Sequence, residues 1–379
     1  MRDMRFLVVA AVVASWGWPA AGADAGTPAR LLVVSVTAGF RHTSIGTAEP
    51  VLEELGRATG HFHCDFLRMP PGRLPQPKAQ KRAQDISDEE WTQQEADFKA
   101  QLEAFHQADR VWQAELAEQF ARVFSAESLR DFDGVIFLST TGELPVPEMT
   151  AFLDWIKSGK AFIGFHAATD TFKSSDAYCE MIGGHFAGHP WNAGGEHAFV
   201  VHEPEHRVAA MFPERFRWQD EIYQYDLRYQ PGNLRVLVSL DMQASSPKEP
   251  WHVPVSWVRD YGKGRVFATN FGHNDATWKS PMFQKHMAEG IAWALGRFDA
   301  PAAPNPAVQA AEYVRSVVAA AAAATQSDAD TLLAKANARI AKDAAWAESL
   351  RPMLLDIRSL KPDDRAAAYG RVIAEVEKP

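Results

Sequence analysis

The stretch "AFIGFHAATDTF", residues 161–172, combines a short apolar strand, a sharp bend and a run of small residues. Residues 161–165 are apolar except for Gly164, and Ala-Ala-Thr follows His166. This order is typical of an α/β protein, in which a parallel strand ends at a turn that presents one side chain to a cleft. Enzymes that form a covalent intermediate place Ser or Cys at such a bend. Here the bend carries His166, so the stretch predicts an α/β fold with an imidazole at the position of the nucleophile.

The chain on both sides of this stretch repeats the alternation of strand and helix. Residues 31–36 are an apolar strand, "IGTAEPVLEELGRATG" is an amphipathic helix that ends at Gly60, and "HFHCDFLRM" is a second strand. Residues 135–138 form another strand, and "LRVLVSLDM" and "VPVSWVRDYGKGRVFATN" follow, with a hairpin turn at Gly262. This order predicts an α/β fold with a mostly parallel sheet flanked by helices.

The first 23 residues have the composition of a secretory signal peptide. Arg2 and Arg5 precede an apolar run from Phe6 to Trp18, and "AGA" at residues 21–23 is a small-residue cleavage signal. The apolar run is short for a membrane span, so a retained anchor is the less favoured alternative. We therefore expect a periplasmic or secreted protein with no membrane association after cleavage.

The balance of charge limits the classes of partner. The chain has a formal net charge of −9, and the signal peptide contains more Arg than Asp, so the mature chain would be more negative still. A negative chain without a basic cluster argues against nucleic acid and anionic lipid as partners. Cys64 and Cys179 are too few for a disulfide scaffold, and the sequence does not decide whether they pair.

Two segments depart from the α/β pattern. Residues 70–118 begin with Pro-rich, basic sequence and continue with a helical run, in which Ser87 and Glu90 form a capping box. We expect one or two helices here, either as a lid over the sheet edge or as an exposed helical hairpin. Residues 299–308 are a Pro/Ala linker, and residues 309–379 are a helical extension without a catalytic motif. The extension is interpreted as a packing element or as a surface for a protein partner or a second copy of the chain.

Histidines are concentrated near the predicted strand ends. The C-terminal ends of parallel strands share one edge of the sheet, where α/β proteins place their sites. The segments "TAGFRHTS", "STTGE", "GFHAATD" and "NFGHND" follow four such strands, and "GGHFAGHPWNAGGEH" adds a Gly-rich loop. Six of the 13 His residues fall in these segments: His42, His166, His185, His189, His197 and His273. Several imidazoles at one edge favour acid/base catalysis, hydrogen bonding to a ligand, or a divalent metal as cofactor.

The spacing of His185 and His189 is that of a metal-binding pair only on a helix. Gly188 and Pro190 argue that this segment is not helical, so a metal is one alternative beside proton transfer. The candidate metal ligands are His185, His189 and His166.

The motifs together resemble the trehalose-utilisation (ThuA-like) family. "LLVVSVTAGFRHTSI", "FDGVIFLSTTGE", "GKAFIGFHAATDTF", "IGGHFAGHP", "DEIYQYD" and "PVSWVRDYGKGRVFATNFGHN" occur in the family's order within a domain at residues 30–298. The resemblance implies a class I glutamine amidotransferase-like fold, related to flavodoxin-like folds. Amidotransferases of this kind have a Cys at the bend, whereas this chain has His166 there and Cys179 further on. Without a thiol at the bend, the chain is not expected to be an amidotransferase.

The resemblance also implies a carbohydrate substrate, either a disaccharide or its 3-keto derivative. Proton abstraction next to a carbonyl needs one base and one electrophile or metal. The expected catalytic residues are His166, His273, Asp170 and Glu221. The expected substrate-binding residues are Arg41, His42, Thr141, Glu143, Trp191, Asn192, Tyr223 and Trp257. Core packing is the alternative role for the aromatic residues, and a non-catalytic sugar-binding or scaffold protein is the alternative function.

Overall fold

The computed structural model describes residues 27–229 and 231–378, and the predicted signal peptide lies outside the described residues. One sheet has the strand order β2 (Phe62–Leu67), β1 (Ala29–Val34), β3 (Gly134–Leu138), β4 (Ala161–Phe165), β11 (Gly264–Thr269), β10 (Pro254–Tyr261), β9 (Arg235–Leu240), β6 (Glu196–Val201) and β7 (Arg215–Gln219). The strands from β2 to β11 are parallel, and those from β11 to β7 pair antiparallel. The predicted α/β class is confirmed.

The parallel strands are apolar on both faces because helices cover both faces. Leu31 and Val33 of β1 lie in one core, and Leu32 and Val34 lie in the other, as alternation along a strand requires. The first core is closed by α1 (Ile45–Thr59) and α7 (Pro281–Ala294), and the second by α4 (Met149–Lys157) and α5 (Asp176–Ile182). The helices on both faces hold the parallel strands in place, and the C-terminal ends of these strands carry the candidate site.

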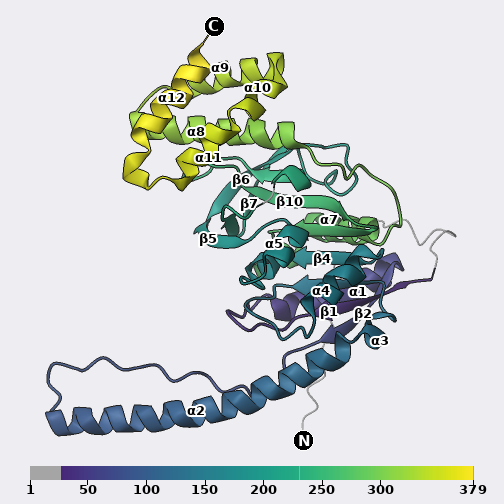
Figure 1. The fold of residues 1–379 in the computed structure, drawn as a ribbon, viewed down its shortest axis with the longest axis vertical. Helices are drawn as coiled ribbons and strands as arrows, with labels where there is room; N and C mark the ends of the chain where they lie inside the picture. Colours follow the sequence, from purple (N-terminus) through teal and green to yellow (C-terminus); the bar gives the residue numbers. More distant parts are fainter. Residues whose placement is uncertain (1–26, 230, 379) are drawn as a thin grey trace, which may run out of the picture.

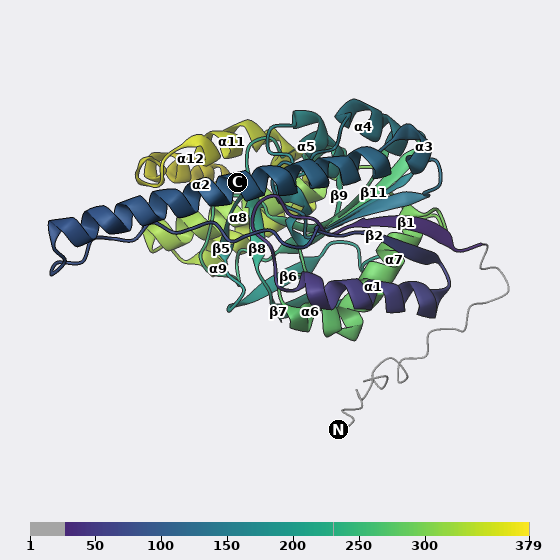
Figure 2. The same ribbon diagram turned by 90° about the horizontal axis from the view of Figure 1, so that it is seen from below.

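The segment between β2 and β3 contains one long helix, α2 (Asp88–Val123), and not a helical hairpin. The predicted capping box is confirmed: Ser87 Oγ accepts a hydrogen bond from Glu90 N–H, and Glu90 Oε2 accepts one from Ser87 N–H. The helix is continuous because neither Gly nor Pro interrupts it. Its last third packs on the second core through Trp112, Leu116 and Phe120. The exposed N-terminal half projects away from the sheet (Figures 1 and 2).

A two-stranded ribbon lies beside the main sheet and corrects one sequence prediction. Residues 186–191 form β5 (Phe186–Trp191), which pairs with β8 (Ile222–Tyr225), so the segment is not simply a Gly-rich loop. The pairing register shifts on both sides of Gly188, whose φ of 134° suits a residue without a Cβ. The ribbon carries His189 and Tyr223 towards the parallel strand ends.

The chain beyond residue 305 forms a layer of helices at the end of the molecule opposite α2 (Figure 1). The layer contains α8 (Pro306–Thr325), α9 (Ala329–Lys342), α10 (Ala344–Ser349), α11 (Arg351–Ser359) and α12 (Ala366–Glu377). These helices share an apolar core of their own. Gln309 of α8 joins the layer to the sheet, since it accepts a hydrogen bond from Tyr229 O–H at 2.9 Å and donates one to Leu234 O at 2.8 Å.

Both cysteines are free thiols in the structure. Burial raises the pKa of Cys64 and of Cys179 to about 12, so neither is a reactive thiolate at neutral pH. Within residues 27–229 and 231–378, no helix combines the length and apolar character needed to cross a membrane.

Candidate functional site

Loops from the C-terminal ends of four neighbouring strands meet at one edge of the sheet. β1, β3, β4 and β11 are adjacent and parallel. Isolated bridges from Thr37 to Thr141 and from Gly142 to Thr171 continue the pairing beyond the strand ends. The prediction that the four segments share one edge is confirmed.

His166 occupies the bend after β4 in a left-handed backbone conformation. Its φ is 48°, which costs a residue with a Cβ about 1–2 kcal/mol. The chain continues as the 3₁₀ turn η2 (His166–Asp170), and an α-helix begins only with α5. The His166 side chain is fully buried, and its Nδ1 lies 2.8 Å from the carbonyl oxygen of Asn270. Because a carbonyl only accepts, Nδ1 carries the proton and Nε2 is the free basic nitrogen.

Four side chains converge on one point beside this bend. His42, His166, Glu221 and His273 each offer one nitrogen or oxygen, and these four atoms lie within 4.8 Å of one another. His273 Nδ1 lies 2.9 Å from Glu221 Oε2 and 3.3 Å from His166 Nε2. The ring of His42 is edge-on to the rings of His166 and His273, at centroid distances of 4.6 and 5.0 Å. We call these four residues the inner cluster; its donor set could hold a metal ion.

His189 of β5 covers the inner cluster on the solvent side. Its Nδ1 lies 3.3 Å from Glu221 Oε1, whereas Oε2 of the same carboxylate faces His166 and His273. The side chains are 54% exposed for His189, 25% for His273, 10% for Glu221 and 0% for His166. A ligand entering from solvent therefore meets His189 and His273 first.

Asp220 and Asn270 position these side chains, and the sequence analysis did not identify either residue. Asp220 is fully buried and accepts hydrogen bonds from the backbone of Gly272 at 2.7 Å, Asn274 at 2.9 Å and Glu221 at 3.1 Å. Asn270 Oδ1 accepts from Tyr223 N–H at 3.1 Å. Both residues belong to motifs quoted above, "DEIYQYD" and "NFGHN", in which neighbouring residues have the more conspicuous side chains.

Burial and the Glu221 carboxylate act differently on the three imidazoles of the inner cluster. Burial, together with the charge of His273, lowers the pKa of His42 to about 4. Burial lowers the pKa of His166 well below its usual value. For His273, burial acts in the same direction, but the hydrogen bond and charge of Glu221 outweigh it and raise the pKa. At neutral pH, His42 and His166 are therefore neutral, and His273 has the greatest tendency to carry a proton.

The structure brings together six of the predicted site residues. They are the four of the inner cluster, His189, and Tyr223, whose hydroxyl lies 3.3 Å from His42 Nε2. His185 belongs elsewhere, although the sequence grouped it with His189 and His166. Its Nδ1 lies 2.9 Å from Asp226 Oδ2, and Arg228 contacts the same ring.

The remaining predicted residues make bonds within the protein. Arg41 donates to Ser35 O, Thr141 donates to Phe40 O, Glu143 accepts from Ser174, Asp170 pairs with Lys173, and Asn192 accepts from Gly194 N–H. Trp191 and Trp257 are fully buried in the apolar cores. Their burial gives both rings a packing role and leaves no face for stacking on a sugar.

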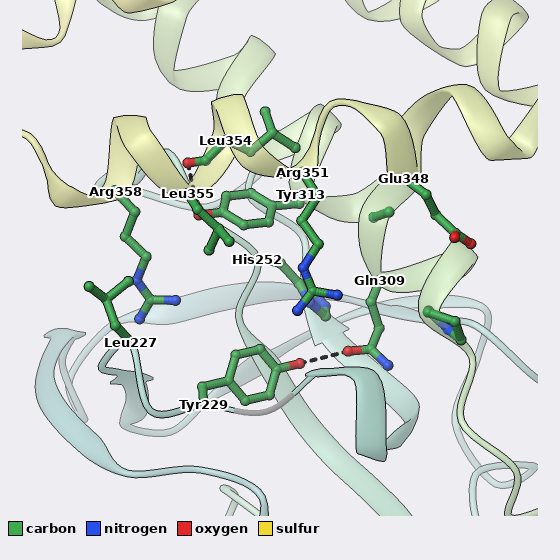
Figure 3. Close-up of a pocket in the computed structure, with 12 residues that line it drawn as sticks. Leu227, Tyr229, His252, Gln309, Tyr313, Glu348, Arg351, Leu354, Leu355 and Arg358 are labelled. Atoms are coloured by element: carbon green, nitrogen blue, oxygen red, sulfur yellow. Dashed lines mark hydrogen bonds between the residues drawn. The ribbon is translucent and has the colours of Figure 1, made fainter.

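A cavity of about 250 Å³ lies away from the inner cluster, where the helical layer meets the sheet (Figure 3). Residues lining it include Tyr229, Gln309, Tyr313 and Arg358. The ring of Tyr229 lies 6.0 Å from that of Tyr225, whose hydroxyl accepts a hydrogen bond from Asn270 Nδ2 at 2.6 Å. Tyr225 and Asn270 thus link the cavity to the residues that support the site.

Comparison with known proteins gives a matching family model and similar solved structures. A family model described as trehalose utilisation (ThuA) matches residues 30–294, which extend from β1 to the end of α7. A ThuA-like protein from Bacteroides uniformis ATCC 8492 is 19% identical, with a TM-score of 0.49, over 76% of this chain and 99% of that one. A ThuA-like protein from Parabacteroides merdae ATCC 43184 is 18% identical, with a TM-score of 0.47, over 72% of this chain and 93% of that one. No curated protein matches the chain.

Proposed function

The chain belongs to the trehalose-utilisation (ThuA) family, and from this premise we propose that it is an exported enzyme acting on a disaccharide or its 3-keto derivative. The observation that carries the proposal is the convergence of three imidazoles and one carboxylate on a single point, below a fourth, half-exposed imidazole. Burial of three imidazoles and a carboxylate together lowers the stability of the fold. A catalytic role therefore explains the cluster more readily than a contribution to stability does.

His189 is assigned as the proton acceptor. Its Nδ1 lies 3.3 Å from Glu221 Oε1, which leaves its other ring nitrogen, Nε2, to meet a substrate. At 54% exposed, it can touch a substrate, whereas the fully buried His166 cannot do so as easily. This division of roles differs from the sequence-based expectation, which places His166 and His273, and not His189, among the catalytic residues.

The inner cluster is assigned the electrophilic role. In a 3-keto-disaccharide, His189 takes the proton from C2, the carbon next to the carbonyl. The electrons of that C–H bond form the C1–C2 double bond as the C1–O bond to the second sugar breaks, and the departing oxygen takes up a proton. Negative charge develops on the C3 oxygen during the step, and the inner cluster is positioned to stabilise it.

The test is turnover of a 3-keto-disaccharide by the purified protein, followed as release of the second sugar. We expect His189→Ala to lower kcat by about 10²–10⁴-fold, the usual contribution of a general base. His63→Ala is the matched control, because His63 is exposed on β2. Binding of the sugar without turnover in the unmodified protein would reject the enzyme and favour a sugar-binding protein.

Export is part of the same proposal, and it depends on residues 1–23 alone. Expression of the full chain in a Gram-negative host, followed by N-terminal sequencing of the protein from the periplasmic fraction, tests it. A mature N-terminus at or near Asp24 supports cleavage after "AGA". An intact N-terminus in the cytoplasmic fraction would reject it.

A further inference from the structure

We infer that the inner cluster binds one first-row divalent metal ion through His42, His166, Glu221 and His273. The inference deepens the proposed function by giving the electrophile a chemical identity, but the metal site itself does not depend on the sugar being the substrate. It also replaces the metal ligands expected from the sequence, since His185 is engaged by Asp226 and Arg228.

The distances within the cluster match those of a metal site. Zinc and its neighbours bind imidazole nitrogen and carboxylate oxygen at about 2.0–2.2 Å, which places two ligand atoms of a tetrahedron roughly 3.3 Å apart. Here His166 Nε2 and His273 Nδ1 are 3.3 Å apart. Glu221 Oε2 lies 2.9 Å from His273 Nδ1 and 3.7 Å from His166 Nε2. Three donor atoms from three separate segments therefore surround one point at ligand spacing.

The contacts around the donors are those that orient metal ligands. A ligating His usually donates its second ring N–H to a carbonyl or carboxylate, which fixes the tautomer. His166 does so through Nδ1 and the carbonyl of Asn270, so that Nε2 faces the other donors. Asp220 holds the backbone at Glu221 and on both sides of His273. This support fixes the donor positions from outside the cluster.

His42 supplies an independent observation. The residue is 4% exposed, and its Nδ1 has no hydrogen-bond partner among the described residues. A buried polar atom left without a partner costs about 1–3 kcal/mol. Its ring also lies against two other imidazoles, an arrangement that offers few hydrogen bonds to compensate. A metal ion shared by these rings would provide the missing interaction.

The donor set selects the class of ion. Three imidazoles and one carboxylate suit zinc, manganese, iron, cobalt or nickel better than calcium or magnesium, which prefer oxygen ligands. Four protein donors leave at least one position free on an ion that takes five or six ligands. His273 and His189 are the more exposed residues here, so a carbonyl oxygen would approach a bound ion from their side, and the ion would polarise it.

The experiment measures metal in the full mature chain without any sugar. Chelator-treated protein is incubated separately with Zn²⁺, Mn²⁺ and Co²⁺, freed of unbound ion by gel filtration, and analysed by mass spectrometry for metal per chain. We expect about one equivalent of at least one ion, and at least a 10-fold lower metal content in Glu221→Gln, which preserves side-chain shape, and in His273→Asn. His63→Ala and His185→Ala should both retain the metal.

Two outcomes would overturn the inference. One is the absence of stoichiometric binding of all three ions by folded wild-type protein. The other is metal that is bound equally by Glu221→Gln and His273→Asn. Because the readout involves no sugar, failure of the keto-sugar assay would leave the metal site intact. Conversely, full sugar turnover by metal-free protein would reject a role for the metal in that reaction and preserve the proposed function, while metal binding would still be decided by the two outcomes above.

Discussion

Asp220 fixes the position of His273 without touching its ring. The buried Asp220 carboxylate accepts hydrogen bonds from the N–H groups of Gly272 and Asn274, the residues on either side of His273. Its Oδ1 also accepts from the N–H of Glu221, so one carboxylate aligns two members of the inner cluster. The loop after β11 and the turn between β7 and β8 are thereby joined at a single buried residue.

Replacement of Asp220 by Asn is expected to lower stability by about 1–3 kcal/mol. The substituted amide keeps one acceptor but turns an NH₂ group towards a backbone donor, so at least one buried N–H loses its partner. Urea denaturation of the purified variant measures the loss. Asp275→Asn is the matched control, because Asp275 is exposed at the start of α6 (Asp275–Lys279), and its effect should stay within about 0.5 kcal/mol. Equal stabilities of the two variants would contradict the role given to Asp220.

Two helical glycines are expected to respond oppositely to substitution by Ala. A Cβ at Gly290 of α7 would lie 2.2 Å from Phe267 Cε1 on β11, so Gly290→Ala forces the helix and strand apart and should cost about 1–3 kcal/mol. A Cβ at Gly46 of α1 meets nothing within 4 Å, so Gly46→Ala should stabilise by about 0.5–1 kcal/mol. Thermal unfolding of both variants gives the sign of each change. Stabilisation by Gly290→Ala would show that α7 and β11 are not in close contact.

The local features of the fold could be predicted because they depend on short-range sequence signals. The apolar run at residues 31–36 marks a buried strand, Gly60 ends α1 in a left-handed conformation with φ 67°, and Ser87 and Glu90 cap α2. The bend at His166 was recognisable for the same reason. Such signals act within a few residues and need no knowledge of the rest of the chain.

The composition of the site could be predicted only in part because it depends on long-range pairing. His42, His166 and His273 follow β1, β4 and β11, which lie within a run of four adjacent strands, but chain order alone does not put β11 next to β4. The ribbon of β5 and β8 brings His189 to Glu221, whereas His185, four residues earlier, pairs with Asp226. Spacing could not separate these two histidines, and the support from Asp220 is visible only once both loops are folded.

The helical layer is expected to loosen from the sheet when Gln309 is replaced by Ala. Gln309 joins Tyr229 and Leu234 to α8 beside the cavity of Figure 3. Its loss leaves the Leu234 carbonyl and the Tyr229 hydroxyl without this partner, at a cost of about 1–3 kcal/mol. Hydrogen exchange should rise in α8 and in the strand β9 beside it, and remain unchanged in β1 and β3. Gln101→Ala, on the exposed part of α2, is the control; unchanged exchange throughout Gln309→Ala would contradict the docking role.

The buried His286 of α7 is expected to make stability depend on pH below neutrality. Its Nδ1 lies 2.6 Å from Val208 O and its Nε2 lies 2.8 Å from Ser256 Oγ, so the neutral ring donates at one nitrogen and accepts at the other. Burial lowers its pKa from 6.5 to about 4. Between these two values the unfolded chain binds a proton that the folded chain does not bind, so stability falls as the pH decreases.

The expected contribution of His286 is about 2 kcal/mol of stability lost between pH 7 and pH 5. His286→Gln removes the titrating group, so its free energy of unfolding should fall less steeply over this range, even if it is lower at pH 7. Urea denaturation at half-unit pH intervals gives both profiles. Other buried histidines titrate in both proteins, and the difference between the two slopes therefore isolates His286. Parallel profiles for wild type and His286→Gln would mean that the folded protein binds this proton as readily as the unfolded chain does.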